Sequence, residues 1–264
     1  MKNHLKGISS LKTKLVNEEG TEIDIYSPDG LKALTRLWTN VFVYNRLMYE
    51  LTWLGIPIIQ FPGDIVMMQE LIWKVRPDVI VETGIAHGGS AILYASILEL
   101  LGNGRVIAID VEIRKYNRLA VNSHPLSHRI EMIEGSSIDP GVVADVRKRI
   151  CKGEKVLVTF DSNHSFSHVL SEMELYSPLV SKDSYMVAMD GTLGLLQGLP
   201  NSKPEWSEDN PLRAIHTFLE RHPDWEIDPY YNRLLITSNP DAFLRRRKES
   251  GEVADRSSSV RVPQ

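Results

Sequence analysis

Residues 79–90 read Val-Ile-Val-Glu-Thr-Gly-Ile-Ala-His-Gly-Gly-Ser, and this stretch decides the fold. A β-branched apolar run ends at an acid, Glu82, and a glycine-rich turn follows at once. Residues 91–101 then have the apolar composition of a buried helix. Glycines let the backbone approach a ligand closely, and the first turn of a helix offers unpaired N–H groups. The stretch therefore predicts a strand, a tight turn and a helix start that together bind a nucleotide-like ligand.

The spacing of these glycines differs from two common phosphate-binding motifs. It matches neither the G-x-G-x-x-G of dinucleotide binders nor the G-x-x-x-x-G-K-[ST] of P-loops. An acid before the glycines repels a pyrophosphate but suits a cationic or hydroxyl-bearing ligand such as S-adenosylmethionine. An ordinary strand-to-helix turn is the alternative interpretation. If the ligand binds here, its contacts are expected to include Glu82, Gly84, His87, Gly88 and Ser90.

The next two predicted strands extend the same pocket. Residues 105–110 read Arg-Val-Ile-Ala-Ile-Asp, and an acid at the end of the second strand of a doubly wound sheet typically binds ribose hydroxyls. Asp110 is therefore the expected ribose ligand, with a capping role at the strand end as the alternative. Ser136 and Ser137 follow the third predicted strand and are expected to line an adenine edge, unless they form only a polar turn.

From residue 79 onward, strand-like and helix-like patterns alternate. We expect strands at 79–82, 105–110, 129–133, 156–160 and 185–189, and helices at about 89–101, 115–122, 140–151 and 166–178. Such alternation predicts an α/β fold with a doubly wound, mainly parallel sheet covered on both faces. A helix at 211–221 precedes strand-like pieces near 226–227 and 234–237, which predict an antiparallel C-terminal edge.

Three segments are expected along the chain. Residues 1–63 form an N-terminal arm and helical extension, 64–245 the ligand-binding domain, and 246–264 a disordered polar tail. Within the first segment, the aromatic-rich stretch 37–53 favours contact between copies of the chain, giving a homo-oligomer, or a core face. Residues 54–63 are expected to form an irregular loop, after which Asp64 caps a helix that ends at Val75.

Composition narrows the class of protein. The chain has 264 residues, 42% of them hydrophobic, and a net charge of −4, which fits a globular protein and argues against nucleic acid as the main partner. The single cysteine, Cys151, fits a reducing compartment. Neither a long apolar run nor a secretory leader is apparent. The expectation is a cytoplasmic protein that binds neither membrane nor nucleic acid.

A second group of polar residues follows the fourth and fifth predicted strands. Asp161 comes directly after residues 156–160, and Asp190 directly after 185–189. Ligands in open parallel sheets sit beyond the carboxyl ends of the strands, so these side chains are expected to meet there. Two carboxylates suit Mg²⁺, and the nearby imidazole of His164 suits a general base. A cluster of polar loops without metal or catalysis is the alternative.

With these residues in view, the chain resembles the cephalosporin hydroxylase / rhamnosyl O-methyltransferase family of class I S-adenosylmethionine enzymes. The resemblance spans roughly residues 35–245 and rests on segments 55–64, 82–90, 135–137, 161–165, 176–180, 190–191 and 210–215. It implies a methyl donor held by Glu82, Gly84 and Asp110, and Mg²⁺ held by Asp161 and Asp190. The family often carries an acidic pair after the fifth strand, whereas this chain has Met189 before the second acid.

The leading functional hypothesis is O-methyl transfer to a hydroxyl of a sugar or glycosylated natural product. An alcohol is a poor nucleophile near neutral pH, so it needs a base, a metal or both, and His164, Asp161 and Asp190 offer these roles. The alternatives are N- or O-methyl transfer to a non-sugar small molecule, and a non-catalytic protein with this fold. Residues 192–210 are expected to close over the acceptor or to form a solvated crossover, and the acceptor itself stays open.

Overall fold

The computed structural model describes residues 14–16, 20–196, 199 and 202–247. Its central feature is a seven-stranded sheet in the order β10-β11-β9-β8-β5-β6-β7. In that order the strands are Trp225–Ile227, Phe243–Arg246, Tyr185–Ala188, Val156–Phe160, Val79–Thr83, Arg105–Asp110 and Ile130–Glu134. The strands from β9 to β7 are parallel, whereas β11 runs antiparallel to both β9 and β10. The predicted doubly wound sheet with an antiparallel C-terminal edge is confirmed.

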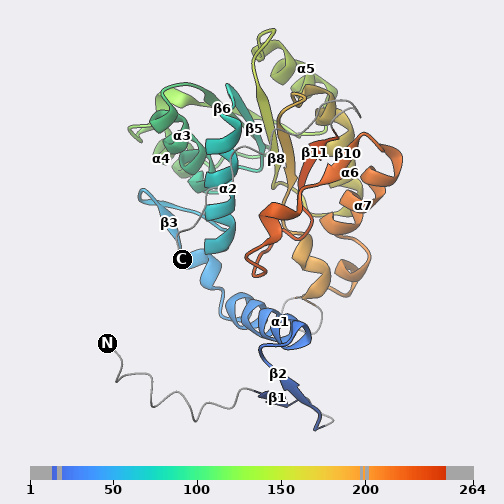
Figure 1. The fold of residues 1–264 in the computed structure, drawn as a ribbon. Coiled ribbons are helices and arrows are strands. Elements are labelled where there is room, and N and C mark those ends of the chain that lie inside the picture. Colours follow the sequence, from blue (N-terminus) through green and yellow to red (C-terminus); the bar gives the residue numbers. More distant parts are fainter. Residues whose placement is uncertain (1–13, 17–19, 197–198, 200–201, 248–264) are drawn as a thin grey trace, which may run out of the picture.

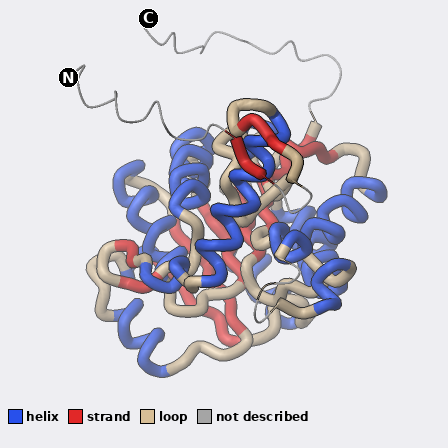
Figure 2. Tube along the Cα trace, turned by 90° about the horizontal axis from the view of Figure 1, so that it is seen from below, coloured by secondary structure: helices blue, strands red, loops and turns tan. Residues whose placement is uncertain are grey.

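Helices cover both faces of this sheet. In Figure 1, α2 (Pro62–Val75), α3 (Gly89–Leu101) and α4 (Lys115–Asn122) lie to one side, and α5 (Pro140–Arg149), α6 (Phe166–Tyr176) and α7 (Pro211–Arg221) lie to the other. Figure 2 shows the same layering from below, with helices flanking the strands. Every residue of β5 and of β8 is buried, which explains why their sequences are continuous apolar runs rather than alternating ones.

An N-terminal extension lies at one end of this domain. Helix α1 (Pro28–Tyr44) follows a small hairpin of β1 (Lys14–Val16) and β2 (Glu22–Asp24), and Figure 1 shows both below the sheet. Trp38 stacks on Phe42, and both rings contact Phe61 just before α2. Leu37 and Val41 on the same helix stay exposed. The aromatic stretch thus contributes a core face and also leaves apolar side chains in solvent.

The C-terminal edge differs from the sequence expectation in one strand. Residues 234–237 do not form a strand, because Leu235 has a left-handed backbone with φ of +67° and cannot continue an extended ladder. The strand is instead β11, in which Phe243 and Leu244 are buried. Strand β11 ends with Arg245 and Arg246, so it includes the first residue of the segment that the sequence predicts to be a disordered polar tail. Of that expected tail, residues 248–264 lie outside the described part of the chain.

The loop before α2 is more ordered than expected. Within 54–63, β4 (Ile56–Pro57) pairs with β3 (Thr52–Trp53) through a turn in which Leu54 and Gly55 both have positive φ. Two such residues in succession give the turn that matches the twist of a hairpin. Helix α2 then begins at Pro62, so the expectation that Asp64 is the cap is wrong; Asp64 lies in the first turn.

Two further helices are shorter than expected. Helix α5 ends at Arg149 because Ile150 is already extended, and α6 ends at Tyr176, where a 3₁₀ turn, Ser177–Leu179, begins. The other short 3₁₀ turns are Leu47–Glu50, Ser127–Arg129, Gly191–Leu195, Pro204–Ser207 and Pro229–Asn232.

Among the helices that the structure describes, none combines the length and the apolar character that crossing a membrane requires.

Candidate active site

Glu82 lies near the carboxyl end of β5 and is fully buried. Within the described residues, neither of its carboxylate oxygens meets a hydrogen-bond partner of ordinary geometry. Burial raises the pKa of Glu82 to about 8; the hydroxyl of Ser90 lowers it, and the charge of Asp110 raises it further. A buried carboxylate without partners is costly, so this position fits a ligand that brings a cation or donors.

A cavity of about 240 Å³ lies over the turn after β5. Its lining includes Gly84, His87 and Ser90, all predicted cofactor contacts, together with residues 57–60 and the acids Asp161 and Asp190. Glu82 is not part of the lining, and its complete burial places it behind the surface. Helix α3 begins at this cavity, directly after Gly88, and no side chain of the described residues caps it, so its first N–H groups are available there.

The glycines of this turn are needed for packing. Gly84 has φ of +91°, and a Cβ there would lie 2.0 Å from the carbonyl oxygen of Asp161. Gly88 has φ of +95°, and its Cβ would lie 2.4 Å from Val121. Each glycine therefore allows the β5 turn to touch a neighbouring element, and larger residues would push the turn away from the strand ends.

Asp110 supports the same turn from the end of β6. One carboxylate oxygen accepts hydrogen bonds from the backbone N–H groups of Ile85 (2.8 Å) and Ala86 (3.2 Å). The other accepts from the backbone of Glu112 at 3.2 Å. Asp110 does not line either cavity described here. Its contact with the donor ribose stays a prediction, and the structure shows that it holds the glycine turn in place.

The two serines after β7 have different surroundings. The hydroxyl of Ser137 lies 3.1 Å from Nε2 of His168, and its carbonyl accepts a hydrogen bond from the Tyr176 hydroxyl. Ser136 is half-buried and its carbonyl accepts from the backbone of Asp139. Neither serine lines the cavities. Both serines therefore lie beside the end of β7, but they do not line the cavity that contains the other predicted donor contacts.

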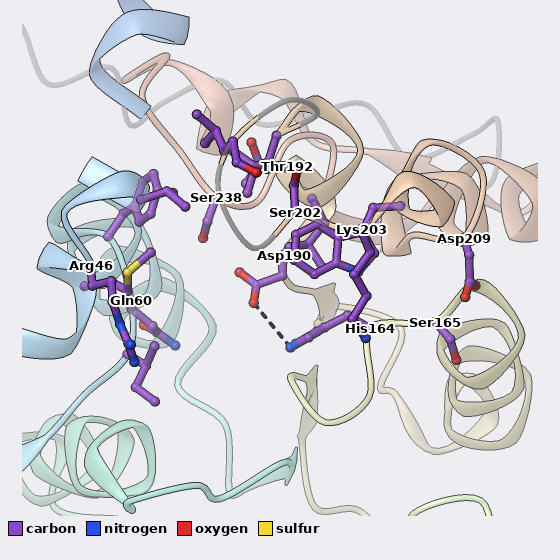
Figure 3. Close-up of a pocket in the computed structure, with 18 of the residues that line it drawn as sticks. Arg46, Gln60, His164, Ser165, Asp190, Thr192, Ser202, Lys203, Asp209 and Ser238 are labelled. Atoms are coloured by element: carbon purple, nitrogen blue, oxygen red, sulfur yellow. Dashed lines mark hydrogen bonds and ion pairs between the residues drawn. The ribbon is translucent and has the colours of Figure 1, made fainter. Parts of the chain in front are cut away.

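The predicted acidic pair meets where β8 and β9 end. These strands are parallel neighbours, and the backbone N–H of Met189 donates to the carbonyl of Phe160, which aligns Asp190 with Asp161. Asp161, His164 and Asp190 each offer one ligand atom, and these atoms lie within 4.8 Å of one another. Figure 3 shows the imidazole of His164 directed at the Asp190 carboxylate, 3.4 Å away. The predicted cluster of two acids and a histidine is present.

Charge repulsion makes this cluster a good cation site. Burial raises the pKa of Asp161 well above its usual value, and the nearby carboxylates of Asp190, Glu82 and Glu172 raise it further. The amide of Gln60 opposes this by hydrogen bonding to the carboxyl. A divalent cation would relieve the repulsion, and hard cations prefer oxygen ligands of this kind.

Asp190 is held in place by a buried network that the sequence pattern did not reveal. Its backbone is left-handed, with φ of +60°, and its N–H donates to the side chain of Asn239 at 2.9 Å. The neighbouring Ser238 donates to Asp64 through both its backbone N–H (2.8 Å) and its hydroxyl (2.9 Å), and Thr237 donates to Asp64 as well. Asp64 thus anchors the segment that supports Asp190.

A larger cavity of about 640 Å³ opens beside the acidic cluster. Residues of the expected acceptor loop line it, among them Thr192, Lys203 and Trp206. Figure 3 shows Arg46 and Gln60 on the opposite side from Thr192 and Lys203. The residues that line both cavities are Tyr49, Ile59, Gln60, His164 and Asp190. A donor in one and an acceptor in the other would meet at this boundary.

Gln60, Asp64 and Tyr94 are site residues that sequence reasoning missed. Tyr94 is fully buried on α3, and its pKa is raised well above the ordinary value by burial and by Glu82 and Asp161. In the sequence, Tyr94 lies within an apolar helix pattern, and Gln60 and Asp64 lie beside prolines and a glycine that indicate a loop. The sequence predicts Asp64 only as a helix cap, and both polar residues fall within the segment 55–64 that carries part of the family resemblance.

Comparison with known proteins identifies the family. The family model described as "Rhamnosyl O-methyltransferase/CmcI" matches residues 45–247. A rhamnosyl O-methyltransferase of Mycobacterium bovis (strain BCG / Pasteur 1173P2) is 30% identical over 217 residues, which cover 77% of this chain and 81% of the relative. The protein of the same name from Mycobacterium leprae (strain TN) is 29% identical over 192 residues, covering 71% and 77%.

Solved structures show the same fold. The structure named "cmcI-D160 Mg-SAM" has a TM-score of 0.54 at 18% identity and covers 76% of this chain and 78% of that one. A putative caffeoyl-CoA O-methyltransferase from Staphylococcus aureus has a TM-score of 0.51 at 17% identity, covering 75% and 90%. The family resemblance and the class I methyltransferase fold expected from the sequence are confirmed. The chain belongs to the rhamnosyl O-methyltransferase/CmcI family of S-adenosylmethionine-dependent O-methyltransferases.

Proposed function

We propose that this chain transfers the methyl group of S-adenosylmethionine to a hydroxyl of a sugar or glycosylated small molecule, with a divalent cation at the acidic cluster. The observation that carries the proposal is the boundary between the two cavities, where both share His164 and Asp190. A transferase must hold donor and acceptor on either side of one set of catalytic groups, because transfer requires the oxygen, carbon and sulfur atoms in line.

Each group at the boundary has a role that follows from its position. The donor would bind over the β5 turn, with Glu82 facing its ammonium group and the α3 N-terminus beside it. His164 would accept the hydroxyl proton as the oxygen forms its bond to the methyl carbon and the carbon–sulfur bond breaks. Asp161 and Asp190 would hold the cation, which supplies a positive charge that lowers the pKa of the acceptor hydroxyl.

A sugar acceptor is supported by the relatives and by the larger cavity. The curated relatives are named rhamnosyl O-methyltransferases. In this chain the cavity combines the ring of Trp206 with hydrogen-bonding groups, including Thr192, Ser202 and Glu205. Apolar side chains, among them Leu193 and Leu196, line it as well, and such a mixture of apolar surface and polar groups suits a hydroxyl-rich ring. The acceptor class is tested by comparing turnover of glycosides and nucleotide sugars with turnover of non-sugar alcohols and amines. The proposal expects turnover of the sugars.

Donor binding should depend on Glu82 and Asp110. We expect Glu82→Ala and Asp110→Ala each to weaken S-adenosylhomocysteine binding by about 1–3 kcal/mol, the cost of losing a hydrogen bond to a charged group. Asp110→Ala should also loosen the glycine turn, because two backbone N–H groups lose their acceptor. Calorimetry measures both, with the exposed Glu112→Ala as the control. Wild-type affinity in both variants would contradict this donor site.

Donor binding should also release a proton from Glu82. With its pKa raised to about 8, the free protein holds Glu82 mostly uncharged at neutral pH. The donor's ammonium favours the charged form, so binding lowers this pKa, and affinity should increase as pH increases toward 8 and then level off. We expect about one proton released per ligand near pH 6.5. Calorimetry in two buffers of different ionisation enthalpy measures it, and Glu82→Gln should lose the release.

Three further properties remain proposals. The exposed apolar residues of α1, among them Leu34, Leu37 and Val41, support contact between copies of the chain. We infer a homo-oligomer, which sedimentation tests by comparing the wild type with Leu37→Glu. Cys151 is a free thiol, which fits the cytoplasm, and fractionation of the producing cell tests this location.

The proposed domain boundaries lie near residues 63 and 245. Expression of residues 64–247 alone tests them.

A further inference from the structure

Gln60 is a buried polar residue whose side-chain oxygen lacks a hydrogen-bond partner among the described residues. It lies between β4 and α2, is only 5% exposed, and lines both cavities at their boundary. Its Nε2 donates to the sulfur of Met189 at 3.4 Å. Its Oε1 is buried and has no hydrogen-bond partner among the residues that the structure describes. Buried amide oxygens are normally satisfied, so an orphaned one at a cavity boundary points to a ligand.

The acidic cluster beside Gln60 is short of oxygen ligands. Asp161 and Asp190 supply carboxylates, and Mg²⁺ prefers six oxygen ligands in octahedral geometry. Met189 offers a thioether, a soft ligand that a hard cation does not favour. The hydrogen bond from Gln60 to Met189 brings the amide beside the residue that precedes Asp190, and the amide also lowers the pKa of the Asp161 carboxyl. Gln60 and Asp190 line the same cavity (Figure 3).

We propose that Oε1 of Gln60 is a third protein oxygen ligand of the divalent cation held by Asp161 and Asp190. An amide carbonyl is among the oxygen groups that suit Mg²⁺ and Mn²⁺. It is neutral, so the two carboxylates balance the charge of a divalent ion and the amide adds a ligand without adding repulsion. This inference rests on the proposed function, because it needs a cation at the cluster.

Manganese binding to the full chain tests this directly, without measuring turnover. Free Mn²⁺ is followed by electron paramagnetic resonance while wild type and Gln60→Met are titrated in the presence of S-adenosylhomocysteine. Methionine keeps the size of the side chain and removes the oxygen. We expect the affinity for Mn²⁺ to fall at least about tenfold, the lower end of losses seen when a partner of a metal site is removed. Gln69→Met, on α2 and outside both cavities, is the matched control.

Two more variants separate ligation from packing. Gln60→Asn keeps a buried amide but draws the oxygen back by one methylene, and it should weaken Mn²⁺ binding as well. Met189→Glu, added to Gln60→Met, places a carboxylate beside the lost amide and should restore or exceed the wild-type affinity. Thermal unfolding and S-adenosylhomocysteine affinity, measured without metal, report whether each variant is folded.

The outcomes distinguish this inference from the proposed function. If Gln60→Met and Gln60→Asn bind Mn²⁺ as the wild type does, Gln60 only packs against Met189 and the assignment is overturned, while the metal site stands. If the wild type binds no Mn²⁺ at all, the metal part of the proposed function fails and takes the assignment with it. Loss of Mn²⁺ affinity in both variants, with recovery through Met189→Glu, supports ligation.

Discussion

Asp190→Asn should abolish turnover while leaving donor binding nearly unchanged, and a chelator should do the same to the wild type. A bound cation contributes several kcal/mol to catalysis of this kind, so we expect a loss of about 10³-fold or more. The donor is expected to bind chiefly at the ends of β5 and β6, whereas Asp190 follows β9. Turnover assays with and without chelator measure the catalytic effect, and calorimetry with S-adenosylhomocysteine measures donor binding. Added Mg²⁺ should restore the turnover of wild type treated with chelator, but not the turnover of Asp190→Asn.

Asp183→Asn is a matched control for this experiment. Asp183 is exposed just before the opposite end of β9 and pairs with Lys155. It should retain full activity, because it lies away from both cavities. Full wild-type activity in chelator, with Asp190→Asn unaffected, would show that this chain works without a metal. In that case, alignment of the substrates and His164 alone would carry the transfer.

His164→Ala should slow turnover by roughly 10²–10⁴-fold if the imidazole is the general base. The side chain is one-third exposed at the shared boundary of the two cavities, and it already contacts Asp190. An added base of similar chemistry, free imidazole, should then restore part of the lost activity by entering the space left behind. Steady-state rates with increasing imidazole measure this rescue.

His216→Ala is the control for the His164 variant, since His216 makes the same type of contact, 3.5 Å from Asp241, away from both cavities. It should show neither loss nor rescue. The titration with Mn²⁺ adds a second distinction. If His164→Ala loses metal affinity as well as rate, the imidazole is a metal ligand rather than a base; if it loses less than tenfold in rate, it only packs.

Much of the fold was predictable because local patterns and the global arrangement agree. Buried parallel strands are continuous apolar runs, and β5, β6 and β8 follow the expected bounds closely. The prediction failed at the C-terminal edge, where neighbours in space decide the structure. Leu234 to Thr237 have strand-like composition, but a left-handed backbone at Leu235 and the contact of Thr237 with Asp64 turn the chain there.

The sequence by itself determined the family, the sheet and the position of the acidic pair, because the carboxyl ends of neighbouring parallel strands must lie together. Only the tertiary structure decided what surrounds that pair. Asp64 and Gln60 come from the segment before β5, yet they support Asp190 and contact Met189, more than a hundred positions later. Contacts between such distant segments leave no periodic pattern in the sequence, since they depend on side chains that meet only once the core has packed.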